Sequence, residues 1–351
     1  MSDRPLTRRG FLLAAGASLG GLAAACAGGD EVSGEPNGAA SQAVVPSETP
    51  LTRTDPPVAT ANPEPVLRLA HLTDMHIAPG DATSSGFARA LRHAQALEPP
   101  VDAVLNTGDC VLESLFADRN ATLAQWDAFN AVLDAELTLP IYHCIGNHDV
   151  WGWGLEDPAL EDDPLFGKGF ALQGLGLARR YYTFDLGSWR FIVLDSTHPS
   201  ILGPGAPHAD IPYTGRLDEE QFQWLEGQLA ATPSAQPVCV VSHIPILSAC
   251  ELLDGPNEES GNWLVPGAWV HIDARRLWEL FRLHPNMRAC LSGHTHQHER
   301  IDYHGVTYLT NGAVCGSWWQ GDYMGFPPAY VVVSFFADGS LESRFVAYDE
   351  T

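Results

Sequence analysis

Short apolar segments rich in β-branched residues recur along the chain, and most of them end abruptly in a group of polar residues. Runs of this length and composition are typical of β-strands. The predicted strands are Val66–Leu72, Val101–Thr107, Leu139–Ile145, Val238–Ser242, Met287–Ser292, Val306–Asn311, Ala329–Phe336 and Leu341–Tyr348. The last three follow one another closely, with turns at Gly312 and Asp338-Gly339, and we expect them to extend a second sheet.

Between many of these strands, apolar residues recur at the spacing of a helix that buries one face. The predicted helices are Phe87–Leu97, Leu123–Leu133, Phe222–Leu229 and Ile272–Leu283. Strands that alternate with amphipathic helices indicate a layered α/β fold.

The first residues show another pattern, that of an export signal. Thr7-Arg8-Arg9-Gly10-Phe11-Leu12 precedes an uncharged apolar stretch that ends at Cys26. Paired arginines ahead of such a stretch resemble a twin-arginine signal, whose pathway exports folded proteins. The stretch is shorter than the ~18–20 residues that span a bilayer, which favours export over a retained anchor. We therefore expect a periplasmic or extracellular protein.

The end of this signal also resembles a lipoprotein cleavage box, in which Cys26 becomes the lipidated first residue and attaches the protein to a membrane. The leucine of the box, Leu22, stands one place earlier than that motif prefers, so cleavage by an ordinary signal peptidase is the alternative. Residues 27–65 are rich in Gly, Ser, Pro, Thr and Glu, which predicts a flexible tether. The predicted organisation is a signal over 1–26, a tether over 27–65 and one folded domain over 66–351.

Composition and charge narrow the classes of partner. Hydrophobic residues make up 45% of the 351 residues, enough for a sizeable core in one large domain. Lys and Arg number 19 against 43 Asp and Glu, a formal charge of -24. Because this charge repels polyanions, we expect no nucleic-acid partner.

Seven cysteines leave six once Cys26 is set aside. Four lie in strand-like runs and are predicted to be buried thiols: Cys110, Cys144, Cys239 and Cys290. Cys250 and Cys315 lie in loop-like sequence, where a disulfide between them is the less favoured alternative to two free thiols.

Five of the predicted strands end in side chains that bind metals. The strand ends carry Asp74-Met75-His76, Gly108-Asp109, Gly146-Asn147-His148-Asp149, His243 and Gly293-His294-Thr295-His296. Open α/β sheets bind ligands at the carboxyl ends of their strands, and oxygen and imidazole donors suit hard or borderline cations. Taken singly, each residue is more often a cap, a turn residue or a core histidine. Together, in this order, they predict a metal centre.

The ordered series resembles the calcineurin-like metallophosphoesterases and, in its Asp-x-His opening, their bacterial cyclic-nucleotide phosphodiesterase branch. The resemblance implies an α/β fold, a four-layer αββα sandwich of two mixed sheets with the metal site at strand C-terminal ends. It implies two metal ions, with Zn, Mn and Fe open as their identities. On the family's pattern the first ion is held by Asp74, His76, Asp109 and His296. The second is held by Asp109, Asn147, His243 and His294.

The resemblance also implies a mechanism, in which a metal-bridging hydroxide attacks the phosphorus of a small phosphodiester. His148 is the expected general acid, because imidazole titrates near neutral pH. Asp149 either orients His148 or caps the following segment. The purple acid phosphatases carry a tyrosine where this chain has Leu112, so no purple colour is expected.

Two other functions stay open at this point. One is a phosphomonoesterase that scavenges phosphate, for which Lys168 and Arg179-Arg180 are candidate partners of the second phosphoryl charge. The other is a non-catalytic metal-binding lipoprotein. Tryptophans near the motifs, Trp151 and Trp153 and the pair Trp318-Trp319, either form an aromatic rim or pack a loop-rich edge, and packing is slightly favoured.

Overall fold

The computed structural model describes residues 64–253 and 257–348 of the chain. The predicted signal with Cys26, and all but the last two residues of the predicted tether, lie outside them. The strands are β1 (Leu67–Leu72), β2 (Ala103–Asn106), β3 (Ile141–His143), β4 (Tyr182–Leu186), β5 (Trp189–Val193), β6 (Thr197–Pro199), β7 (Tyr213–Gly215), β8 (Val238–Val241), β9 (Met287–Ser292), β10 (Glu299–Tyr303), β11 (Val306–Thr310), β12 (Ala329–Phe335) and β13 (Leu341–Ala347). The helices are α2 (Asp81–Gln95), α3 (Arg119–Glu136), α4 (Gly169–Gly174), α5 (Glu219–Ala231), α6 (Asn257–Ser260) and α7 (Ala274–Phe281), with 3-10 turns at Pro158–Asp162 and Cys250–Leu253.

Two mixed sheets form the centre of the domain. A five-stranded sheet has the order β13-β12-β1-β2-β3, and a six-stranded sheet has the order β10-β11-β9-β8-β5-β4. In the five-stranded sheet β1, β2 and β3 are parallel, whereas β12 pairs antiparallel with both β1 and β13. In the six-stranded sheet β11, β9, β8 and β5 are parallel, and the edge strands β10 and β4 pair antiparallel. Strands β6 and β7 form a separate two-stranded ribbon.

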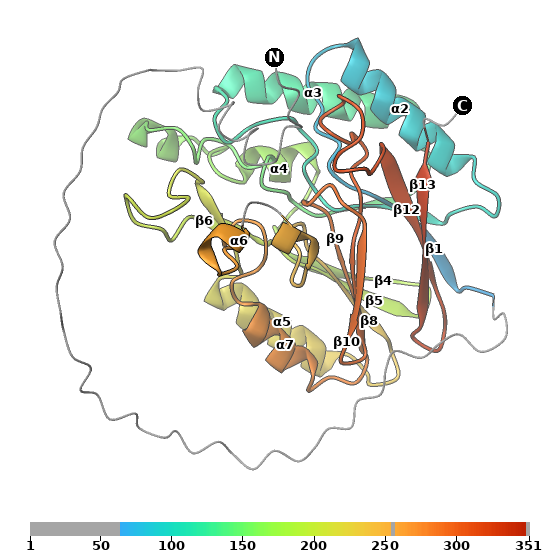
Figure 1. Cartoon of the computed structure of the whole chain (residues 1–351). Coiled ribbons are helices and arrows are strands. Elements are labelled where there is room, and N and C mark those ends of the chain that lie inside the picture. The colour runs from blue at the N-terminus through green and yellow to red at the C-terminus, as the bar shows by residue number, and fades with distance from the viewer. Residues whose placement is uncertain (1–63, 254–256, 349–351) are drawn as a thin grey trace, which may run out of the picture. The chain divides into compact units, whose positions relative to one another are not determined.

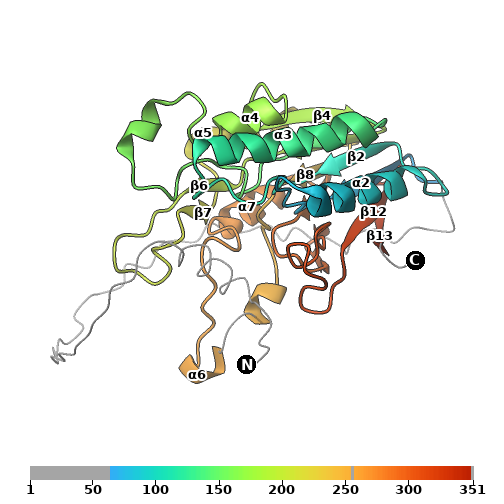
Figure 2. The ribbon, with the colours of Figure 1, turned by 90° about the horizontal axis from the view of Figure 1, so that it is seen from above.

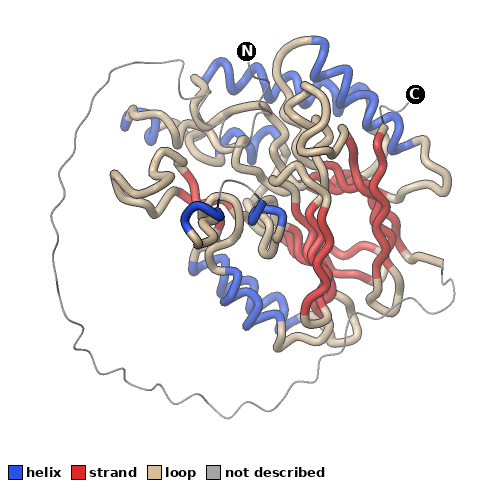
Figure 3. Tube along the Cα trace, in the orientation of Figure 1, coloured by secondary structure: helices blue, strands red, loops and turns tan. Residues whose placement is uncertain are grey.

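The sheets face each other across a core to which both contribute. Leu69 and Leu105 of the five-stranded sheet and Phe191, Val241 and Leu291 of the six-stranded sheet are fully buried in this one cluster. Helices α2 and α3 lie over the outer face of the first sheet, and α5 and α7 lie over the outer face of the second (Figures 1 and 2). The succession helix, sheet, sheet, helix is the predicted four-layer αββα sandwich, and Figure 3 shows the strands between one set of helices above and another at the lower left.

Aspartate caps explain why two helices begin before their apolar pattern does. The Asp118 carboxylate accepts hydrogen bonds from the backbone N–H groups of Asn120 and Ala121, both at 2.9 Å, and so starts α3. Asp218 starts α5 in the same way by accepting from Gln221 N at 2.7 Å. Such caps satisfy amide groups that have no partner within the helix.

The expectation that the last three predicted strands share one sheet is wrong. β11 pairs with β9 in the six-stranded sheet, whereas β12 and β13 form a hairpin that joins β1 in the other sheet. The reason is that the segment 311–328 carries the chain from one sheet to the other. The turn at Asp338-Gly339 is confirmed, and Gly339 has a φ of 85° there.

No strand is predicted over residues 182–193, where the structure has the hairpin β4–β5. The sequence signal was present, since aromatic and apolar residues alternate with polar ones on each side of Gly187. All six cysteines of the described segments are free thiols, and Cys315 is buried while Cys250 is half-buried. Within these segments no helix has both the length and the apolar character needed to cross a bilayer.

Candidate metal centre

Seven side chains expected to hold metals meet at one end of the two sheets. They come from the loops that follow β1, β2, β3, β8 and β9, and each is at most 2% exposed. They are Asp74, His76, Asp109, Asn147, His243, His294 and His296. Parallel strands from both sheets therefore bring residues up to 222 positions apart in sequence to one buried spot, as the carboxyl-end rule for α/β sheets predicts.

The first group of donors includes His76, the last residue of the Asp-x-His motif, and His296, the last residue of the His-x-His motif. The Nε2 atoms of His76 and His296 lie 3.0 Å apart. Asp74 Oδ1 lies 3.3 Å from His296 Nε2 and 3.8 Å from His76 Nε2. These donor atoms converge on a single position, the one the family's pattern assigns to the first metal.

A second group surrounds His243. Its Nε2 atom lies 2.9 Å from Asn147 Oδ1, 3.1 Å from His294 Nδ1 and 3.2 Å from Asp109 Oδ2. The same Asp109 oxygen lies 3.8 Å from His76 Nε2 in the first group. Asp109 is thus placed between the two groups, as a carboxylate that bridges two cations must be.

Backbone carbonyls hold three of the imidazoles from behind. His243 Nδ1 contacts Thr107 O at 2.8 Å, and His296 Nδ1 contacts Gly316 O at 2.7 Å. His294 Nε2 contacts Ala268 O at 3.0 Å. A carbonyl can only accept, so each of these nitrogens carries a proton, which leaves the other nitrogen as the one that can bind a cation. This is the usual support of histidines that bind metals.

Backbone strain is concentrated at the same residues. Five of the seven have a positive φ: Asp74 at 54°, His76 at 46°, Asp109 at 53°, His294 at 75° and His296 at 58°. Left-handed backbone at a non-glycine residue costs about 1–3 kcal/mol and persists where the surroundings enforce it, most often at functional sites. The strained turns aim the donor side chains inward.

Two glycines of the motifs are required by close packing of the loops. A Cβ at Gly146 would lie 2.2 Å from Asp109 Oδ1. A Cβ at Gly293 would lie 1.9 Å from Thr73 Oγ1 and 2.6 Å from Asp74 Oδ2. Glycine lets the backbone approach the carboxylates.

The buried carboxylates and imidazoles of the centre shift one another's pKa values. Burial opposes ionisation of Asp74 and Asp109, yet the surrounding imidazoles outweigh it and hold both carboxyl pKa values well below their usual range. Burial also opposes the His243 imidazolium, but the Asp109 carboxylate outweighs it and raises the pKa of His243 to about 9. The buried carboxylates thus attract positive charge.

These residues fit a pair of metal ions. The buried Asp74 Oδ1 atom has no hydrogen-bond partner within the described part of the chain, although it faces two imidazoles. The Nε2 atoms of His76 and His296 face each other at 3.0 Å, so both are within reach of a single cation. The donor set of carboxylate, amide and imidazole suits Zn, Mn or Fe.

His148 lies at the edge of this centre and is 5% exposed. A ring nitrogen of His148 lies within 4.8 Å of donor atoms of His76 and Asp109. Its Nδ1 contacts Leu112 O at 2.7 Å, and the carboxylate of Glu113 lies 3.6 Å from the same nitrogen. Leu112 and Glu113 stand three and four residues after Asp109. Their role in orienting His148 was not predicted, because the sequence does not show which loop faces His148.

Asp149 neither orients His148 nor caps the following segment, so both predictions for it are wrong. Its carboxylate accepts hydrogen bonds from the backbone N–H groups of Asp109, Cys110, Val111 and Gly146, at 3.0, 2.8, 3.3 and 2.8 Å. It therefore ties the loop after β2 to the loop after β3. Only the fold brings these four amide groups around one carboxylate.

The predicted aromatic residues separate into two roles. Trp151 is fully buried and packs against Phe166 and Phe170, as the packing interpretation expects. Trp318 instead lies beside the metal centre, with its ring 4.4 Å from that of His296 and 5.8 Å from that of His76. An aromatic wall therefore borders the first group of donors.

Two of the cations considered for a second phosphoryl charge are already paired. Lys168 forms an ion pair with the buried Asp195. Arg180 pairs with Asp195 at 2.9 Å and also with Asp218. Arg179 is exposed. These pairs hold together the region around the end of β5.

Comparisons with known proteins agree with this geometry. A model of the family described as calcineurin-like phosphoesterase matches residues 67–298. The chain is 24% identical over 294 residues to a 3',5'-cyclic-nucleotide phosphodiesterase from Nostoc sp., covering 79% of this chain and 91% of that protein. It is 24% identical over 256 residues to the 3',5'-cyclic adenosine monophosphate phosphodiesterase CpdA of Escherichia coli, covering 71% and 76%.

Among solved structures, a dimetal phosphatase from Danio rerio matches with a TM-score of 0.55 at 19% identity, over 82% of this chain and 100% of that one. This likeness supports the fold. The family model covers more than half of the chain and includes all seven metal-binding candidates. The chain therefore belongs to the calcineurin-like phosphoesterase family, and it is a metal-dependent phosphoric ester hydrolase whose named relatives favour a phosphodiesterase.

Proposed function

We propose that the protein is a binuclear-metal phosphodiesterase that hydrolyses a small phosphodiester, with cyclic nucleotides as the first substrates to test. The observation that carries the proposal is the position of Asp109, whose Oδ2 lies 3.2 Å from His243 Nε2 and 3.8 Å from His76 Nε2. One carboxylate within reach of two separate groups of donors is the arrangement that holds two cations side by side.

When bound, two such cations lower the pKa of water to about 7 and offset the charge of a phosphate ester. The chain's own part is to hold them and to move a proton. His148 keeps the proton on Nδ1, because Leu112 O can only accept it. Its Nε2 is then the atom that carries a proton to the departing oxygen of the substrate. The Glu113 carboxylate, 3.6 Å from the same Nδ1, helps to orient the ring.

Charge favours a diester over a monoester. A phosphomonoester brings a second negative charge, which calls for an added cationic group. Lys168 and Arg180 are engaged with Asp195 and Asp218, so their charges are already compensated. The names of the relatives from Nostoc and Escherichia coli point to cyclic nucleotides as the diester class.

The test compares bis(p-nitrophenyl) phosphate with p-nitrophenyl phosphate, using protein stripped of metal and reloaded separately with Mn, Zn and Fe. The proposal predicts metal-dependent hydrolysis with a preference for the diester, followed by cleavage of 3',5'-cyclic nucleotides. A preference for the monoester would assign the chain to the phosphate-scavenging phosphatases instead. Two bound ions without turnover of either ester would favour the non-catalytic metal-binding lipoprotein.

We also propose that the protein is exported by the twin-arginine pathway and held at a membrane through Cys26. The support is the sequence around Arg8-Arg9 and the cleavage box that ends at Cys26. Replacing both arginines by lysine should leave the protein in the cytoplasm, as measured by cell fractionation. Cys26→Ala should abolish incorporation of labelled fatty acid. Export of the double-lysine variant would contradict the pathway, and labelling of Cys26→Ala would contradict the anchor.

A further inference from the structure

A cysteine thiol lies next to the first group of metal donors. Cys315 belongs to the loop that follows β11 and is fully buried. Its backbone N–H donates to Asp74 O at 3.2 Å, and the N–H of Val314 donates to Thr73 O at 2.9 Å. Two backbone hydrogen bonds thus fasten this loop to the turn that carries Asp74.

The same loop supports His296 from the other side. Gly316 O, adjacent to Cys315, accepts the proton of His296 Nδ1 at 2.7 Å. The sulfur atom is therefore placed by a backbone that is bonded both to the Asp74 turn and to the His296 ring. Such a double attachment fixes the position of a donor side chain before any metal arrives.

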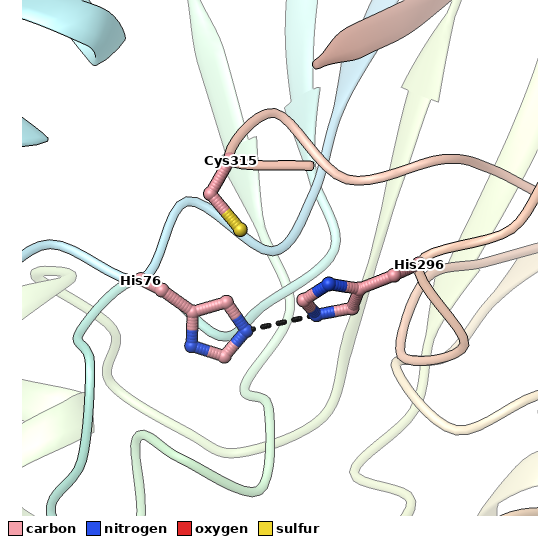
Figure 4. Close-up of side chains that lie close together, drawn as sticks. All are labelled: His76, His296 and Cys315. Carbon is pink, nitrogen blue, oxygen red and sulfur yellow. Dashed lines mark hydrogen bonds between the residues drawn. The ribbon is translucent and has the colours of Figure 1, made fainter. Parts of the chain in front are cut away.

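The sulfur of Cys315 and one nitrogen each of His76 and His296 all lie within 4.8 Å of one another. Figure 4 shows the sulfur directed toward the side on which the two imidazole rings face each other. Two donors on one zinc ion are separated by at most the sum of a Zn–N and a Zn–S bond, about 4.4 Å. The 4.8 Å limit is close to this sum, so binding of an ion would have to draw the three donors only slightly together.

The other thiols of the described segments have different surroundings. Cys239 and Cys290 lie in the apolar clusters on either side of the six-stranded sheet. Cys110 accepts a hydrogen bond from the Asn106 side chain at 3.0 Å. The Cys315 sulfur contacts Gly316 O at 3.5 Å, a weak hydrogen bond, and also lies within hydrogen-bond reach of the backbone N–H groups of Trp318 and Trp319, so its polar contacts are with its own loop beside the imidazoles.

We propose that Cys315 supplies a sulfur donor at the first metal position, which biases that position toward thiophilic ions such as Zn, Fe or Co over Mn. The inference rests on the proposed function, because it takes Asp74, His76 and His296 as the other ligands. On binding, the S–H bond breaks, the proton leaves to solvent and the sulfur lone pair bonds the ion. Sulfur ligands select softer metals, whereas carboxylates and water suit Mn.

The test uses cobalt, whose spectrum separates the two proposals. Full-chain protein is stripped of metal and titrated with Co(II), and visible d–d bands report any bound ion. A sulfur ligand adds an intense charge-transfer band in the near ultraviolet. We expect both features in the wild type, and only the d–d bands in Cys315→Ser and in Cys315→Ala. Two variants are used so that a folding defect in Cys315→Ser does not decide the result.

Cys250→Ser is the matched control, because this thiol is half-buried and lies outside every group of converging donors in the described segments. It should keep the charge-transfer band. Competition between Zn and Mn gives a second measurement. Cys315→Ser should lower the ratio of Zn affinity to Mn affinity by at least about tenfold, the lower end of the loss that is typical when a metal site is disturbed.

The outcomes are distinct. Visible d–d bands without a charge-transfer band in the wild type would overturn the sulfur ligand and leave the metal centre intact. A band that survives in both Cys315 variants would do the same. Absence of any cobalt binding in the wild type would overturn the metal centre itself, and the inference with it.

Discussion

The two groups of donors in the metal centre, its two halves, differ in the number of charged ligands they contain. The first contains the Asp74 carboxylate besides the shared Asp109, together with the imidazoles of His76 and His296. The second has the neutral amide of Asn147 where the first has a carboxylate. Its two imidazoles come from His243 and His294.

This difference predicts different affinities for metal. Affinity for a cation rises with the number of charged ligands and with the rigidity of the site. The first position counts two carboxylates and the second only the shared one, so the first should fill earlier and release its ion later. The second position is then the one whose occupancy controls turnover.

The largest expected effect comes from the residue that both halves share. Asp109→Asn removes the bridging charge, so both ions should be lost and turnover of the diester should fall by at least about a thousandfold, the upper range for loss of one electrostatic group. Metal content and hydrolysis of bis(p-nitrophenyl) phosphate measure this. Asp127→Asn, an exposed aspartate of α3, is the control and should behave as the wild type. Two ions retained in Asp109→Asn would contradict a bridge.

The second-largest expected effect distinguishes the two metal positions. Asn147→Ala and His294→Ala remove donors of the second position only, so about one ion should remain and turnover should fall by roughly a hundredfold or more. Equilibrium dialysis followed by elemental analysis counts the ions. Normal turnover by these variants, after chelation and reloading, would refute the assignment of the second position.

A substitution that removes no metal donor should affect only the transfer of a proton to the leaving group. His148→Ala should keep both ions and slow esters with poor leaving groups by about a hundredfold, the lower range for a general acid. Esters of p-nitrophenol, which leave without help, should be affected much less. Equal losses for both kinds of substrate, or loss of metal, would show that His148 acts as a ligand or a structural residue instead.

The smallest expected effect tests the first position by itself. Thr73 Oγ1 donates to Asp74 Oδ2 at 2.6 Å and so fixes the carboxylate. Thr73→Val should weaken metal binding at the first position by about tenfold, as loss of a supporting hydrogen bond does, and leave the second unchanged. Thr73→Ser keeps the hydroxyl and should bind as the wild type. Competition with a chelator of known affinity measures the change, and an equal weakening of both positions would argue against separate halves.

Much of the fold and of the centre could be predicted from sequence, because the donors follow directly upon apolar strand segments. Asp74, Asp109 and His243 each stand two or three residues after the end of a strand, so the carboxyl-end rule was sufficient to group them. The family resemblance added their division between two positions.

What could not be predicted depends on contacts between distant backbones. Thr107 O, Ala268 O and Gly316 O hold imidazoles, yet every residue has a carbonyl, so no side-chain pattern marks them. Asp149 was misread for a related reason, since its amide partners converge only when the loops after β2 and β3 meet. The last three strands were expected in one sheet, but β11 lies in a different sheet from β12 and β13, because strand order depends on long-range pairing.

The most direct test of the binuclear proposal is a titration of metal-free protein in which diester hydrolysis and bound metal are measured at each addition. The proposal predicts little activity while the first equivalent binds, then a rise that ends at two equivalents per chain. Full activity at one equivalent would contradict a centre that needs both positions.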